Sequence, residues 1–371
     1  MFTIISPTLS SSIVGSSNFT PSSMQQVGVN YSKQGGKWIY CNFPETYTTS
    51  DIVTATGGRV FNKVNISGTK PHQVFFSYQP KTTMTSYFNI QIQNTGTTTI
   101  TLTVTNKGIR HTADASFANV DSAQLWNKTS GESWRDFFAG TNETITIPAG
   151  ESRWIVKDYV KPWQAGLITG NVRFSMGNAS NTATVYVYMA NATGLSGVGK
   201  SPVTYDNGKY YSGYSDGYML AANVTVKASE LSSKKCIYLN HPSGIQNMRI
   251  GGTSVTSDLL PITLTNGSVI SYNTAGQNLG NWGAQYIYTL NLYNDTSVAK
   301  TFNVYLRSGV TGSYDYPVIM SGTNFEYARL QAQAWKWLTI TVPANTTKTD
   351  TFQYILGTNS SDKKEMIFEL A

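Results

Sequence analysis

The chain has 371 residues, which is enough for two domains that each bury a hydrophobic core. Hydrophobic residues make up 40% of it, so the composition excludes an intrinsically disordered chain. Charged residues reach only 13%, against a usual level of about 25%. The net charge of +7 comes from scattered basic residues, and no basic run alternates with aromatic ones, which argues against nucleic-acid binding.

Residues 1–36 are rich in serine and show little periodicity. This pattern is typical of a loosely attached N-terminal arm. The alternative is a strand that pairs with the sheet edge of a neighbouring subunit. These first residues also lack the basic segment and the long apolar stretch of a signal peptide, and no apolar run approaches the roughly 18 residues of a membrane-spanning helix.

Residues 37–226 form the first predicted domain, in which apolar and polar residues alternate with period two. We expect strands at 73–78, 88–92, 100–104, 154–156, 172–176 and 183–188. The turn signal Asn94-Thr95-Gly96 predicts that 88–92 and 100–104 are neighbouring strands. The stretch 109–142 differs, and we expect either one helical turn each at 122–126 and 133–138 or a loop across the end of a sandwich.

Residues 227–371 form the second predicted domain, which is all-β by the same signals but lacks a long insertion after its first hairpin. Three segments of the first domain recur at an offset of roughly 200 residues: 39–44 as 237–242, 87–94 as 287–294, and 144–150 as 339–345. The last pair ends in a turn where Gly150 and Asn345 are expected to adopt positive φ. These matches predict an internal duplication and an all-β fold of two tandem β-sandwich domains, immunoglobulin-like or jelly-roll in topology.

The two cysteines, Cys41 and Cys236, fall near equivalent points of the repeat but with opposite strand parity, so they should face opposite sides of their sheets. Two buried free thiols are the favoured interpretation. An interdomain disulfide stays open, because sequence cannot test its geometry.

The stretch 94–102 and the later segment 147–152 resemble bacterial immunoglobulin-like surface modules. The fuller set, which adds 42–44, 75–78 and 280–286 and covers most of the chain from Trp38 onward, is similar to secreted proteins of Gram-positive spore-forming bacteria. The resemblance implies an exported, cell-surface, non-enzymatic role. It carries over no catalytic residue.

Aromatic residues are the one positive signal for a binding surface. Five tyrosines crowd one segment, and tyrosine is favoured at interfaces. Two tryptophans lie two apart in a predicted strand, where they could stack on a sugar ring or fill the sandwich core. The contact-surface candidates are therefore Tyr205, Tyr210, Tyr211, Tyr214, Tyr218, Trp335 and Trp337.

No catalytic, cofactor-binding or metal-binding constellation emerges. The G-x-S-x-G match at 213–217 lacks the following helix that a nucleophile elbow requires. The histidines, His72, His111 and His241, have no ligand-type residue at metal-binding spacing.

We therefore expect a non-enzymatic structural subunit of an extracellular or cell-surface assembly, such as a surface layer or appendage, that associates with itself. One alternative is a carbohydrate-binding surface protein, with cell-wall polysaccharide as partner. Another is a virion structural protein.

Overall fold

The computed structural model describes residues 1–19, 24–42, 46–52, 57–83, 85–112, 122–160, 166–191, 206–207, 213–239, 249–250, 253–254, 260, 263–264, 281–308, 315–357, 360 and 364–371. Strands dominate, and the all-β prediction is confirmed. Two compact units divide the chain: unit 1 contains Met1–Gln34, Met219–Leu260 and Leu279–Ala371, and unit 2 contains Gly35–Tyr218 and Pro261–Asn278. Among the described residues, no helix combines the length and apolar character needed to cross a bilayer.

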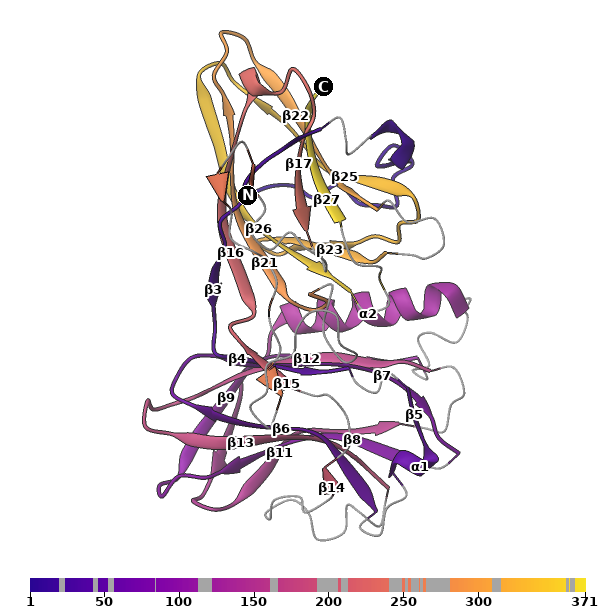
Figure 1. The fold of residues 1–371 in the computed structure, drawn as a ribbon, viewed down its shortest axis with the longest axis vertical. Helices are drawn as coiled ribbons and strands as arrows, with labels where there is room; N and C mark the ends of the chain where they lie inside the picture. Colours follow the sequence, from indigo (N-terminus) through magenta and orange to yellow (C-terminus); the bar gives the residue numbers. More distant parts are fainter. Residues whose placement is uncertain are drawn as a thin grey trace. The chain divides into compact units, whose positions relative to one another are not determined.

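Unit 2 is a sandwich of two sheets (Figure 1). The larger sheet runs β10 (Glu143–Ile147), β9 (Ile100–His111), β12 (Ile168–Met176), β7 (His72–Lys81), β4 (Lys37–Cys41), β15 (Gly213–Asp216) and β20 (Thr263–Leu264), with β5 (Thr46–Thr48) also paired to β7. The five-stranded sheet runs β11 (Ser152–Val160), β8 (Ser86–Asn94), β13 (Thr182–Ala190), β6 (Gly58–Ser67) and β14 (Asp206–Asn207).

The core of unit 2 lies between these sheets, because alternate residues of each strand point inward. Phe76 of β7 and Phe88 of β8 are both fully buried, and their ring centroids lie 4.2 Å apart across the sandwich. The short helix α1 (Thr49–Ile52) buries Ile52 in the same cluster.

One continuous helix, α2 (Ser122–Ala139), replaces the two helical turns or loop expected in this stretch. It packs along the sheet through β9 and β12, with Trp134 and Phe137 buried (Figure 1). Gly108 of β9 allows this approach, since a Cβ there would overlap the Ser133 carbonyl oxygen. The sequence pattern missed the helix because its large apolar residues fall in two groups, 125–126 and 134–138, separated by the polar stretch 127–133 instead of repeating along it.

Unit 1 also contains two sheets. One runs β1 (Ile13–Gly15), β25 (Gln333–Val342), β22 (Lys300–Arg307), β27 (Lys364–Leu370), β17 (Lys235–Leu239) and β2 (Gln25–Gln26). The other runs β24 (Asn324–Tyr327), β23 (Pro317–Ser321), β26 (Thr346–Leu356), β21 (Gln285–Asn294), β16 (Met219–Lys227) and β3 (Ser32–Gln34). Strands β18 (Arg249–Ile250) and β19 (Thr253–Ser254) pair separately, and 3₁₀ turns occupy Ser16–Asn18 and Ala228–Glu230.

The N-terminal residues differ from the loosely attached arm that we expected. Strands β1, β2 and β3 pair with β25, β17 and β16 of the same chain, so the segment extends both sheets of unit 1. The units therefore interleave along the sequence, whereas the expected boundaries were 1–36, 37–226 and 227–371. Strands of only two or three residues are held by backbone hydrogen bonds and are too short to show a hydrophobic pattern.

A shared strand order supports the expected duplication. The order β10-β9-β12-β7 in unit 2 matches β25-β22-β27-β17 in unit 1, and β11-β8 matches β26-β21. The turn residues of the repeat also behave as predicted, since φ is 76° at Gly150 and 55° at Asn345. The match of 39–44 with 237–242 does not fit, because β4 lies one strand further along its sheet than β17.

The buried residues Asn94 and Asn294 make the same bonds in both units. The Asn94 side-chain amide donates to the Thr98 and Ile147 carbonyls at 2.8 and 2.9 Å, and Asn294 donates to Val298 and Val342 at the same distances. In each unit, the side-chain oxygen accepts the backbone N–H two residues on. Each asparagine therefore ties its own strand to the end of the strand before the Pro turn.

Candidate functional site

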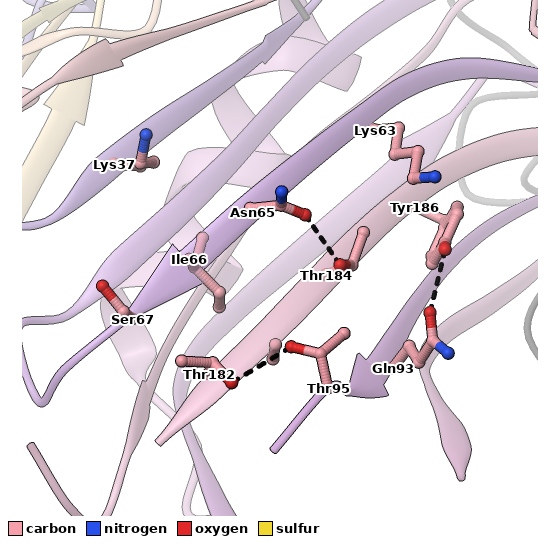
Figure 2. A pocket seen from close by; sticks show the side chains of 11 residues that line it. Lys37, Lys63, Asn65, Ile66, Ser67, Gln93, Thr95, Thr182, Thr184 and Tyr186 are labelled. Atoms are coloured by element: carbon pink, nitrogen blue, oxygen red, sulfur yellow. Dashed lines mark hydrogen bonds between the residues drawn. The ribbon is translucent and has the colours of Figure 1, made fainter. Parts of the chain in front are cut away.

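The candidate site is a groove of about 640 Å³ in unit 2, lined mostly by outward-facing residues of the five-stranded sheet and also by Lys37 of β4 in the larger sheet; this volume is typical of ligand sites (Figure 2). We call it the β6–β13–β8 groove. Its lining residues are Lys37, Lys63, Asn65, Ile66, Ser67, Gln93, Thr95, Thr182, Ala183, Thr184 and Tyr186.

Strand alternation produces this polar face. On β6, Val64 and Ile66 enter the core while Lys63, Asn65 and Ser67 point outward and are exposed. The same alternation on β13 buries Ala183, Val185 and Val187 in the core and turns Thr182, Thr184 and Tyr186 to the outer face.

Three hydrogen bonds fix the groove floor (Figure 2). Thr184 Oγ1 donates to Asn65 Oδ1 at 2.8 Å, and these residues are direct cross-strand partners. The Tyr186 hydroxyl donates to Gln93 Oε1 at 2.9 Å, while Thr95 Oγ1 donates to Thr182 Oγ1 at 3.2 Å. Burial raises the pKa of Tyr186, so its hydroxyl remains a donor at neutral pH.

Two lysines supply the charge, and no lining residue is acidic. Lys63 pairs across the strands with Tyr186, and its Nζ lies 5.5 Å from the centroid of that ring. Lys37 Nζ lies 3.4 Å from the ring centroid of Tyr214, one of the predicted contact tyrosines. The groove is therefore cationic and lined by neutral amides and hydroxyls.

The two tryptophans, for which sugar stacking and core filling were both considered, are buried. Trp335 and Trp337 are each 0% exposed, as in the core-filling alternative. The Trp337 ring packs on Phe352 with centroids 4.6 Å apart, and Trp335 Nε1 donates to the Ile5 carbonyl at 2.9 Å. Neither ring can stack on a sugar as it is placed.

The predicted tyrosine cluster is only partly described. Tyr205, Tyr210 and Tyr211 lie outside the described residues. Tyr214 is half-buried in β15, next to the groove through Lys37. Tyr218 is fully buried, and its ring lies where a Cβ on Gly35 would need to be, so it belongs to the interior.

Ser215 and His72, which were considered for catalysis or metal binding, are both buried. Ser215, in the G-x-S-x-G match, is 2% exposed within β15 and pairs with Trp38. His72 is buried, and its Nδ1 accepts the Lys37 backbone N–H at 2.9 Å. Burial and the nearby Lys37 charge lower the pKa of His72 to about 4. His241 lies outside the described residues, among which no cluster of three potential metal ligands occurs.

Neither cysteine forms a disulfide, and both are buried, as favoured from the sequence. Cys41 belongs to the core between the sheets of unit 2. Cys236 belongs to a separate cluster with Phe19, Met24 and Ile367 in unit 1. Along β27, Ile367 alternates with the buried residues Met366 and Phe368, so this cluster covers the other face of its sheet. The predicted opposite orientation of the two thiols agrees with this placement.

The β6–β13–β8 groove was missed in the sequence because its three strands are far apart along the chain. The sequence contains two signals, the alternating polar residues Lys63-x-Asn65-x-Ser67 and Thr182-x-Thr184-x-Tyr186. Each set lies on the outward face of one strand. Such alternation indicates a solvated sheet face and does not reveal which rows are neighbours.

No family model and no curated protein matches the sequence. Among solved structures, tripeptidyl peptidase 2 is 8% identical with a TM-score of 0.19, and the alignment covers 83% of this chain but only 22% of that chain. The tandem CBM22 domains of Xyn10C from Paenibacillus barcinonensis are 10% identical with a TM-score of 0.14, covering 92% and 98%. Vicilin from Corylus avellana is 8% identical with a TM-score of 0.15, covering 96% and 86%. Likenesses at these scores identify no family and assign no function.

Proposed function

We propose that the protein is a non-enzymatic structural subunit of an extracellular or cell-surface assembly, in which copies of the chain join through sheet edges. The observation that carries this proposal is the edge strand β10. Among the described residues it pairs only with β9, and its outward edge is available to another strand.

Strand β10 lacks the features that usually protect an edge. Its five residues, Glu143 to Ile147, include no lysine, proline or bulge. Its one charge, Glu143, is paired with Lys107 at 2.9 Å. Its β-branched residues favour an extended chain and suit the addition of a strand from a second copy.

A second edge occurs in unit 1. Strand β24 is last in its sheet, and Phe325 and Tyr327 on it are half-buried. One self-complementary edge produces a closed dimer, whereas two different edges on each copy allow growth into a larger assembly. The pair β10 and β24 therefore supports a polymer or layer.

Sedimentation velocity over a series of concentrations, with electron microscopy of the same samples, tests the proposal. The wild-type protein should form larger species as concentration rises. The variant T144K/T146K should no longer form the larger species, because two lysines on β10 disfavour the addition of a strand from a second copy at this edge.

The matched control is T289K/N291K, which adds the same charge to β21 at positions that pair with β16 on one side and with β26 on the other. This control should assemble like the wild type. A wild-type protein that stays monomeric at every concentration would overturn the proposal.

A further inference from the structure

We propose that the β6–β13–β8 groove binds an anionic polysaccharide, a function separate from assembly through β10 and β24. The argument rests on the hydrogen-bonding groups that the groove offers, on its charge and on its shape.

The groove offers donors more than acceptors. The oxygens of Asn65 and Gln93 already accept the hydroxyl protons of Thr184 and Tyr186. Within the described part of the chain, the amide nitrogens of Asn65 and Gln93 donate to no protein group, so four N–H bonds remain for a ligand. A ligand rich in acceptor oxygens satisfies them.

Charge selects an anion. Lys37 and Lys63 add two ammonium groups, each with three donors, and no carboxylate lines the groove. No described acidic residue forms an ion pair with either lysine. Charge-assisted hydrogen bonds from these groups to carboxylate or sulfate oxygens are about twice as strong as those between neutral groups.

The shape favours a chain over a small enclosed ligand. Lys63, Asn65 and Ser67 on β6 and Thr95 and Thr182 beside them are exposed, so the groove is open along the strands. Tyr186, which is 6% exposed, gives the groove a small apolar area on which the C–H face of a sugar ring can pack. A saccharide with carboxylate or sulfate groups matches both this area and the donors.

The corresponding face of unit 1 lacks this donor excess. There, Asn291 Oδ1 accepts from Thr349 at 2.7 Å, and its amide nitrogen donates to the Val224 carbonyl at 3.4 Å. Thr289 and Thr351 bond to each other. Because these polar groups satisfy one another, the unit 1 face provides an internal control.

Affinity electrophoresis in gels that contain polygalacturonate tests the proposal, with chondroitin sulfate as the sulfated probe. Fully methyl-esterified polygalacturonate and dextran are the neutral probes, and polyglutamate is an anion without sugar rings. The wild-type protein should be retarded by one or both acidic polysaccharides, less so at high salt, and should bind the other three weakly or not at all.

Two variants test the lysine charges and the amide donors separately. K37Q/K63Q should weaken binding by about tenfold or more, because two charge-assisted contacts are lost. N65D/Q93E keeps both acceptor oxygens for Thr184 and Tyr186 but replaces the amide donors with carboxylates, and it should abolish binding. Both variants should keep the wild-type circular dichroism spectrum.

The control K227Q/K348Q removes the same number of charges from unit 1 and should bind like the wild type. Binding of polyglutamate as strong as that of the acidic polysaccharides would overturn the proposal. Equal losses in K37Q/K63Q and K227Q/K348Q, or no binding of either acidic polysaccharide, would also overturn it. None of these results depends on whether the protein assembles.

Discussion

The two units differ in the chain segment that connects two matching strands. In unit 2 the connection from β9 to β10 carries the helix α2, which packs on its own sheet. In unit 1 the matching connection from β22 to β25 carries the hairpin of β23 and β24, which extends the opposite sheet beside β26. We expected the second copy to lack such an insertion, and this prediction is wrong. A conserved strand frame thus accepts quite different inserted structures.

The two units share what we call the asparagine bridge, the side-chain hydrogen bonds that Asn94 makes in unit 2 and Asn294 makes in unit 1. They differ in how deeply their ion pairs are buried. The described ion pairs of unit 2 are partly exposed, as in Lys107–Glu143. Unit 1 instead contains Lys364 and Asp315, which are 1% and 0% exposed and 2.8 Å apart. Comparison of the two units therefore separates the shared strand frame from the features particular to each unit.

The largest expected effect comes from breaking the buried ion pair of unit 1. Lys364→Met removes the ammonium group that lies 2.8 Å from the buried Asp315 carboxylate, which should lower the free energy of unfolding by about 3–5 kcal/mol. Urea denaturation followed by circular dichroism measures this change. The double variant K364M/D315L should recover much of the loss, and a double variant no more stable than K364M would show that the pair is not the cause.

The asparagine bridge provides a test of equivalence between the units. Asn94→Ala and Asn294→Ala each remove two hydrogen bonds from a buried side-chain amide to carbonyl oxygens, so each should cost about 2–4 kcal/mol of unfolding free energy. Thermal and urea denaturation of both variants should give similar values. A cost confined to one variant would mean that the second bridge is an incidental likeness.

Loss of stability between pH 6.5 and about 4 should come from His72 of unit 2. The pKa of His72 is about 4 in the folded protein, below its ordinary value of 6.5, so only the unfolded chain takes up a proton between these values. The stabilising effect is complete above pH 6.5 and is lost as the pH falls toward 4, by about 2–3 kcal/mol.

His72→Asn should flatten this pH dependence, because the asparagine oxygen can accept the Lys37 N–H without titrating. Urea midpoints measured at intervals from pH 4 to 7 compare the two proteins. A slope unchanged in the variant would assign the acid sensitivity to other groups.

The smallest effect concerns the turn that ends the repeated strands. Gly150→Ala places a Cβ on a residue with a φ of 76° and should cost about 1 kcal/mol, whereas Asn345→Gly relieves positive φ at 55° and should change stability by only a few tenths of a kcal/mol. Differential scanning calorimetry measures the change in stability caused by each substitution. Equal destabilisation by both substitutions would contradict the proposed equivalence of the turns.

The sequence predicted those features that depend on local patterns. Period-two alternation located β8, β9 and β13, and turn chemistry identified the positive φ of Gly150 and Asn345. Strand partners depend on long-range pairing, which alternation does not encode. For this reason the roles of β1, β2 and β3 in unit 1 and the meeting of Asn65, Gln93 and Thr184 in one groove became visible only in three dimensions.

The buried thiols have a practical consequence. Burial raises the pKa of Cys41 to about 12, so this side chain stays protonated and unreactive near neutral pH. Cys236 is equally inaccessible, at 0% exposure. A cysteine introduced on the surface, for example at Ser32 or Thr349, should then be the one position that a maleimide dye modifies in the native protein, without prior removal of either natural sulfur.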